Sequence, residues 1–90
     1  MTKHPSAQKR HRQSLKRHAR NQAIRSRVRT FVKRVRESID AGNAAAASEQ
    51  LGGATRALDK AVTKGVLHRN TAARKISRLT RAVRKLAARA

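Results

Sequence analysis

The stretch IRSRVRTFVKRVRESIDAGN, residues 24–43, contains both a helical stripe and the turn that ends it. Its apolar residues recur three and four positions apart, which is the spacing of one face of an α-helix. They are Ile24, Val28, Phe31, Val32, Val35 and Ile39. Gly42 predicts a helix stop, because glycine enters the left-handed backbone conformation at little cost. Asn43 can then cap a second helix that runs back along the first.

Two further segments repeat the helical pattern, and no segment alternates like a strand. Their stripes are Ala44, Ala47, Leu51, Ala54, Leu58 and Val62, then Ala72, Ile76, Leu79, Val83 and Leu86. Gly65 predicts the end of the middle helix, and Asn70 or Thr71 is predicted to cap the last one. We therefore predict an all-α fold, an up-down-up three-helix bundle with a long first helix. The pair Gly52-Gly53 leaves the continuity of the middle helix open, because each glycine weakens a helix interior.

The N-terminal residues do not fit into this bundle. At about 100° per residue, Arg10, Arg17 and Arg20 fall on or beside the continuation of the first apolar stripe. Charges at those positions cannot be buried without partners. We therefore divide the chain into a basic N-terminal arm, residues 1–23, that projects beyond the bundle, and a three-helix bundle, residues 24–90. Like charges oppose helix formation in the isolated arm, so we expect it to become helical when a polyanion neutralises them.

The charge of the chain points to that polyanion. The sequence holds 24 Lys and Arg against 4 Asp and Glu, a formal net charge of +20, and residues 1–36 contain no acid. Nucleic acid fits such a field best, because its phosphates release counterions when Lys and Arg replace them. Phe31 is the only aromatic residue, so base stacking on aromatic platforms is not available. The remaining mode is recognition of backbone shape, which suits folded RNA.

Several function classes find no support in the sequence. There is no Cys and no catalytic motif, so we predict a non-enzymatic protein without a cofactor or metal. His4, His11 and His18 recur every seven residues, but about 10.5 Å of helical rise separates neighbours, too far for ligands of one ion. His68 precedes the last helix, where it can contact phosphate or cap a helix end. No segment is apolar enough to span a bilayer, although the Arg-rich start has the composition of a transit peptide.

Three segments match a known family. They are KGVLHRNTAARKISRL (residues 64–79), SAQKRHRQSLKR (residues 6–17) and RTFVKRV (residues 29–35). The first closely resembles the signature segment of the bacterial small-subunit ribosomal protein S-twenty family, and the others are similar to its opening and its mid-helix pattern. Gly52-Gly53 departs from that family, which more often has helix formers there. The match covers nearly the whole chain.

The resemblance implies a structural constituent of the small ribosomal subunit that binds ribosomal RNA directly and joins early in assembly. The implied RNA contacts are the 5′ domain and the long helix near the 3′ end, with few protein neighbours, no membrane and no small-molecule substrate. The implied location is the cytoplasmic ribosome, with an organellar ribosome left open.

We predict RNA contacts from the basic residues of the arm and of the first and last helices. They are Lys9, Arg10, Arg12, Lys16, Arg17, Arg20, Arg27, Arg34, Arg69, Arg74, Lys75, Arg78 and Arg81. An alternative is a nucleoid-type protein that binds duplex DNA without sequence preference. A membrane-active helix would need an apolar face on the arm, which Leu15 alone does not supply.

Overall fold

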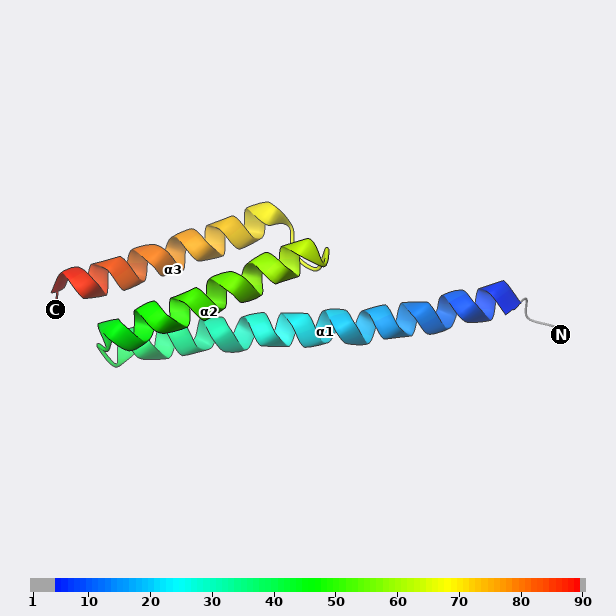
Figure 1. The fold of residues 1–90 in the computed structure, drawn as a ribbon, viewed down its shortest axis with the longest axis horizontal. Coiled ribbons are helices and arrows are strands. Elements are labelled where there is room, and N and C mark those ends of the chain that lie inside the picture. The colour runs from blue at the N-terminus through cyan, green and yellow to red at the C-terminus, as the bar shows by residue number, and fades with distance from the viewer. Residues whose placement is uncertain (1–4, 90) are drawn as a thin grey trace.

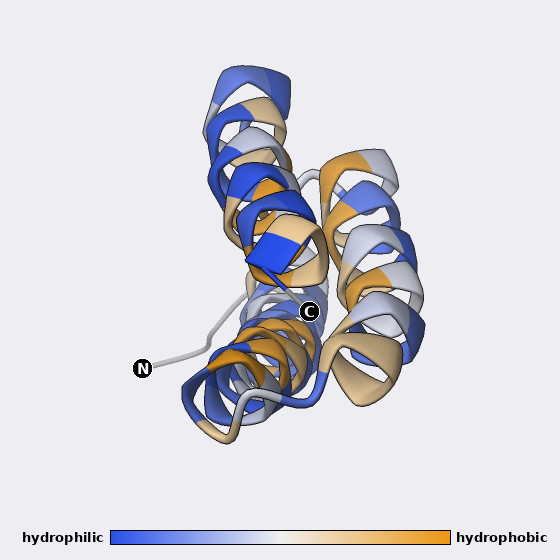
Figure 2. Ribbon diagram, turned by 90° about the vertical axis from the view of Figure 1, so that its left-hand side faces the viewer, coloured by the Kyte–Doolittle hydropathy of each residue, from blue (hydrophilic) through white to orange (hydrophobic). Residues whose placement is uncertain are grey.

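The computed structural model describes residues 5–89 of the 90-residue chain. These residues form three helices, α1 (Pro5–Asp40), α2 (Ala44–Thr63) and α3 (Arg69–Arg89), and no strand occurs among them. The helices run up, down and up (Figure 1). A view along the bundle shows them at the corners of a triangle (Figure 2). The predicted all-α three-helix bundle is confirmed.

The first helix is much longer than its neighbours. It continues without interruption through the predicted boundary at residue 24, and its N-terminal part projects past the end of the bundle (Figure 1). Every residue from 6 to 20 is exposed, so nothing in the bundle packs against this stretch. The molecule consequently measures 68 × 22 × 14 Å. The projecting basic part of the first helix is as predicted.

The turn between α1 and α2 is built by two adjacent residues, as the sequence predicts. Gly42 adopts φ = +71° and donates its N–H to the Ile39 carbonyl at 3.0 Å. Asn43 donates its N–H to the Ser38 carbonyl at 3.0 Å, which completes the hydrogen-bond pattern of a glycine helix stop. The Asn43 side chain then accepts the N–H of Ala46 at 3.0 Å and caps α2. The helices therefore reverse direction over a few residues.

The turn between α2 and α3 follows the same design at its start. Gly65 adopts φ = +73°, and Val66 donates its N–H to the Ala61 carbonyl at 2.9 Å. The predicted cap of α3 at Asn70 or Thr71 is wrong, because α3 already begins at Arg69. The residue before α3, His68, accepts the N–H of Asn70 on its side-chain Nδ1 at 3.1 Å. An imidazole nitrogen thus takes the place of the usual capping oxygen.

The core consists of two clusters stacked along the bundle. The predicted stripes supply most of both clusters, and Val66 and Leu67 close one end. Ala57 and Ala61 are buried as well, although they lie beside the predicted stripe of α2. The buried members are Val28, Ala57, Leu58, Ala61 and Ala72 in one cluster, and Val35, Ala47, Ala54, Leu79 and Val83 in the other. Many of these side chains are alanines, which allow the helix backbones to approach closely.

The glycine pair does not interrupt α2, which settles the continuity that the sequence left open. Gly53 is buried, and a Cβ atom built on it would lie 2.8 Å from Cε1 of Phe31. The aromatic ring of α1 therefore occupies the space that a side chain would take. Helix α2 has extensive contacts with both neighbours, whereas α1 and α3 share far fewer. One side of the bundle is consequently more open than the other two.

Candidate nucleic-acid interface

The predicted contact residues are all exposed, as a binding role requires. The structure divides them among three places on the molecule. Six lie on the arm, two on the side of α1 next to α2, and five on α3. In that order they are Lys9, Arg10, Arg12, Lys16, Arg17 and Arg20, then Arg27 and Arg34, then Arg69, Arg74, Lys75, Arg78 and Arg81.

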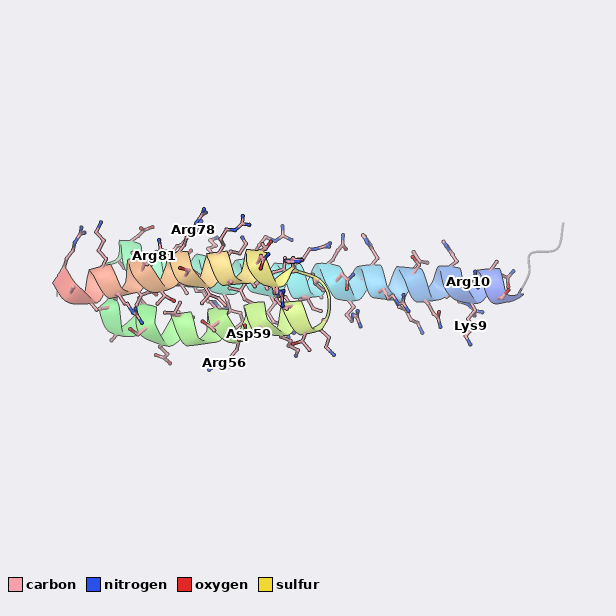
Figure 3. All side chains as sticks on the ribbon, turned by 90° about the horizontal axis from the view of Figure 1, so that it is seen from above. Lys9, Arg10, Arg56, Asp59, Arg78 and Arg81 are labelled. Carbon is pink, nitrogen blue, oxygen red and sulfur yellow. The ribbon has the colours of Figure 1, made fainter. Side chains whose placement is uncertain are left out.

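The arm has one cationic face. At about 100° per residue, the six Lys and Arg side chains in the described part of the arm, residues 5–23, fall within an arc of about 160°. The opposite arc holds His11, Leu15, His18 and Gln22 and no Lys or Arg. Side chains stand out along the whole arm with nothing covering them (Figure 3). The arm therefore presents its positive charge mainly to one side.

The histidine ladder of the arm does not form a metal site in the described part of the chain. His11 and His18 are exposed, while His4 lies outside the described residues. Residues 5–89 contain no group of three His, Cys or acidic side chains that could hold an ion.

Within the same range, no helix is long and apolar enough to cross a membrane.

The outer face of α3 is a second cationic surface. Arg74 and Arg81 point away from the side on which Leu79 and Val83 are buried, and Arg78 lies at the edge of this face next to α1. Figure 3 shows Arg78 and Arg81 on one side of the bundle, and Arg56 and Asp59 of α2 on the other. No acidic residue occurs in the sequence of α3. This surface therefore keeps its full positive charge.

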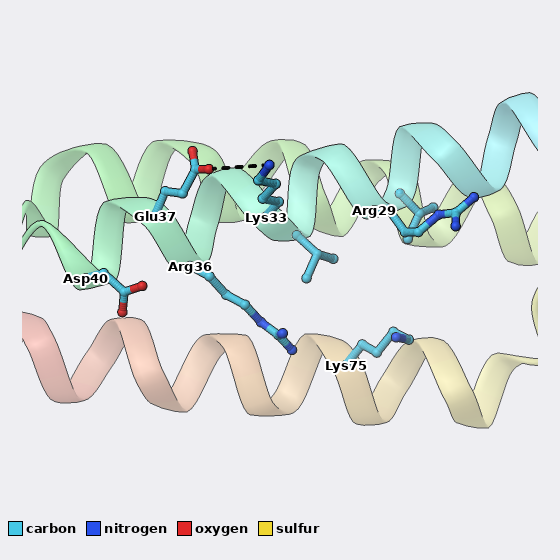
Figure 4. A pocket seen from close by; sticks show the side chains of 8 residues that line it. Arg29, Lys33, Arg36, Glu37, Asp40 and Lys75 are labelled. Atoms are coloured by element: carbon cyan, nitrogen blue, oxygen red, sulfur yellow. Dashed lines mark ion pairs between the residues drawn. The ribbon is translucent and has the colours of Figure 1, made fainter.

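A third surface is the groove between α1 and α3, which sequence reasoning missed as a unit. Three adjoining hollows follow this groove, and Lys75 lines all three. Val28 links the first to the second, and Val32 links the first to the third. Figure 4 shows Arg36 extending from α1 toward α3, with Lys75 on the opposite wall. The cations that line the groove are Arg25, Arg29, Lys33, Arg36, Lys75 and Arg78. We refer to this surface as the α1–α3 groove.

The groove residues of α1 are absent from the predicted contacts, although their spacing in the sequence marks them as one flank of the helix. Arg25, Arg29 and Arg36 follow one flank of the α1 stripe at helical spacing, and the predicted Arg27 and Arg34 follow the other. The structure places the first flank in the groove. It places Arg34 on the far side, with its guanidinium 5.6 Å from the centroid of the Phe31 ring. Because Phe31 packs on Gly53 of α2, this second flank lies beside α2.

Acidic side chains offset little of this charge. Within residues 5–89 the structure has one ion pair, between Lys33 Nζ and Glu37 Oε1 at 3.9 Å (Figure 4). These side chains are 77% and 63% exposed, so the pair contributes under about 1 kcal/mol. Glu37 and Asp40 line the groove at the end nearest the α1–α2 turn. The cations of the rest of the groove therefore remain available for an anionic partner.

The comparison with protein families decides what kind of protein carries these surfaces. The family model described as ribosomal protein S20, which is the S-twenty family named above, matches residues 2–84. The chain belongs to the ribosomal protein S20 family. The resemblance seen in three segments of the sequence is thereby confirmed, and so is the prediction that the protein is not an enzyme.

Relatives in the S20 family are similar to this chain over nearly their whole length. "Small ribosomal subunit protein bS20" of Maridesulfovibrio salexigens is 51% identical over 87 residues, covering 97% of this chain and 100% of the relative. The protein of that name from Solidesulfovibrio magneticus is 54% identical, covering 94% and 96%. The one from Corynebacterium efficiens is 58% identical over 78 residues, covering 87% and 90%. The similarity to S20 family members therefore covers most of this chain.

Proposed function

We propose that this protein is a structural constituent of the small ribosomal subunit that binds small-subunit ribosomal RNA directly and assists early subunit assembly. The relatives named small ribosomal subunit protein bS20 support the ribosomal role. The observation that carries the RNA role is the set of exposed cationic surfaces on a chain of net charge +20. A ribosomal role also implies a location on the cytoplasmic ribosome.

The arrangement of the surfaces supports a mechanism based on charge and geometry. The outer face of α3 and the α1–α3 groove belong to one rigid bundle, while the arm extends about 22 Å beyond it over residues 6–20. RNA segments bound to the bundle and to the arm are held at a fixed relative position, because one continuous helix joins the two sites. By resemblance to the family, we assign these segments to the 5′ domain and to the long helix near the 3′ end.

The side chains favour reading of RNA shape over reading of bases. Phe31 is packed against Gly53, so the chain offers no aromatic platform on which unpaired bases can stack. Arg side chains dominate the surfaces, and their planar guanidinium groups donate bidentate hydrogen bonds to phosphate. Such contacts position folded RNA without specifying its sequence.

The division into a bundle, residues 24–90, and an arm, residues 1–23, is part of this proposal. Residues 6–20 are all exposed, and their like charges disfavour a helix in the absence of a partner. We expect phosphates to neutralise these charges and to stabilise the arm in the helical form that the structure describes. The arm then orders as the complex forms, which couples RNA folding to protein folding.

The experiment that tests this function is binding of the labelled 5′ domain of small-subunit ribosomal RNA at near-physiological salt. Excess duplex DNA and excess unrelated RNA serve as competitors. We expect tight binding to survive both, because a specific RNA architecture is recognised. If duplex DNA competes as well as the cognate RNA, the proposal fails and the nucleoid-type alternative replaces it.

A further inference from the structure

The arm leaves the bundle beside the turn between α2 and α3. Helices α1 and α2 are antiparallel, and Gly53 of α2 contacts Phe31 of α1. Lys64, eleven residues after Gly53, therefore lies level with Arg20, eleven residues before Phe31. The core agrees, because Ile24 packs in the same cluster as Val66 and Leu67. Figure 1 shows this turn over α1 at the start of the unaccompanied part of the helix.

The arm presents cations toward the side on which the turn lies. Along α1, Arg10 and Arg17 lie in nearly the same angular direction as Val28 and Val35, at about 100° per residue, and Arg20 lies to one side, about 80° from Val28. Those two valines are buried against α2 and α3, so their direction is the inward direction of the helix. The three arginines therefore lie on the side of α1 next to the α2–α3 turn.

The turn supplies a second cationic wall. Lys64, His68 and Arg69 are all exposed, and the first turn of α3 contains no acid. His68 accepts the N–H of Asn70 on Nδ1, so the neutral ring carries its proton on Nε2. That N–H remains available as a hydrogen-bond donor. We call the place where the arm leaves the bundle beside this turn the inner corner. Its cationic and donor side chains are Arg10, Arg17, Arg20, Lys64, His68 and Arg69.

Asn21 adds a polar group to the inner corner. It lies next to Arg20, one turn before Ile24, and therefore level with the end of α2. Its Oδ1 is shielded from solvent and has no hydrogen-bond partner within the described part of the chain. This acceptor can take a donor from a bound molecule, such as the 2′-hydroxyl of RNA, only when the Asn21 side chain turns outward.

We propose that the inner corner holds one RNA helix, whose backbone contacts the arm and the α2–α3 turn at the same time. This inference rests on the proposed function and adds that the arm shares its RNA segment with the turn. Cations on both walls neutralise neighbouring phosphates of one backbone, and the turn stops the RNA helix from sliding along the arm. The opposite face of the arm, which carries Leu15 and no cation, faces away from this RNA helix.

The test uses radical-generating probes attached to single cysteines, since the sequence contains no Cys. Gln13→Cys places the probe on the inward face of the arm between Arg10 and Arg17 without removing a charge. His68→Cys places it on the turn, and Lys64→Cys replaces that variant if the loss of the His68 cap prevents folding. Leu15→Cys, on the opposite face, is the matched control. Each labelled protein is bound to full-length small-subunit ribosomal RNA, and the cleaved nucleotides are mapped.

We expect the probes at positions 13 and 68 to cleave an overlapping stretch of nucleotides, and the probe at position 15 to cleave a different one. Arg17→Gln and Arg69→Gln should each weaken protection of the shared stretch in footprinting, whereas Arg81→Gln on α3 should leave it unchanged. Separate cleavage patterns from positions 13 and 68, in variants that still bind the RNA, would overturn the inner-corner proposal alone. If the parent protein does not bind the RNA, the proposed function is wrong and this inference falls with it.

Discussion

The Phe31 ring lies where the side chain of residue 53 would otherwise be. A Cβ atom on Gly53 would come within 2.8 Å of Cε1 and 3.0 Å of Cδ1 of that ring, closer than real Cβ contacts. The neighbouring Gly52 has only Arg56 Nη1 nearby, at 3.8 Å from its ideal Cβ position. The two adjacent glycines therefore have different surroundings. Gly53 makes room for the only aromatic residue, whereas Gly52 has room for a methyl group.

This difference predicts opposite effects of two alanine substitutions. Gly52→Ala should stabilise the protein by up to about 1 kcal/mol, because alanine is the better helix former. Gly53→Ala gains the same propensity but forces Phe31 to move, so we expect a net loss of about 1 kcal/mol. Urea denaturation followed by circular dichroism measures both. Equal effects of the two substitutions would show that Phe31 does not pack on Gly53.

Charge removal in the α1–α3 groove should weaken RNA binding uniformly. Arg29→Gln is expected to lower the slope of log K against log salt by about one unit without changing base preference. Arg56→Gln is the matched control, because it removes an equal charge from the exposed face of α2, away from the groove. Binding is measured over a series of salt concentrations. A change in base preference at one RNA position would contradict the proposal that the protein recognises RNA shape.

The arm should be the least stable part of the free protein. Residues 6–20 are all exposed, so no tertiary contact stabilises their helix, and we expect their amides to exchange rapidly with solvent. RNA binding should slow this exchange strongly. The amides of Val35 and Leu58, at the centres of the two core clusters, serve as the protected reference. Strong protection of the arm in the free protein would contradict coupled ordering.

Two substitutions at His68 should separate its structural role from RNA contact. His68→Ser supplies a hydroxyl that can cap α3, so stability should change little while RNA affinity falls. His68→Ala removes the group that accepts the Asn70 N–H and should cost about 1 kcal/mol of stability in addition to the lost affinity. Thermal unfolding and RNA binding are measured for both variants. Unchanged RNA affinity in the serine variant would limit His68 to capping.

The sequence anticipated the helices and their first turn because these features depend on local chemistry. Val28, Val35 and Leu58 lie at helical spacing in their stripes and are all buried. Gly42 and Asn43 form the turn that their backbone and side-chain preferences predict. The α3 cap was predicted at Asn70 or Thr71, because local preference favours capping oxygens, and capping was only one of two roles left open for His68. The structure has the His68 imidazole nitrogen in that place.

Sequence alone determined that three amphipathic helices reverse at glycine turns and that an acid-free basic segment extends past the core. Spacing, backbone freedom and charge are properties of neighbouring residues, so they can be seen before folding. Only the tertiary structure decided which flank of α1 faces α3 and that Gly53 makes room for Phe31. In an up-down-up bundle the third helix can pack on either side of the first two. The side that α3 takes depends on how all three helices fill one core. In this protein α3 packs on the side that brings Arg29, and not Arg34, into the groove.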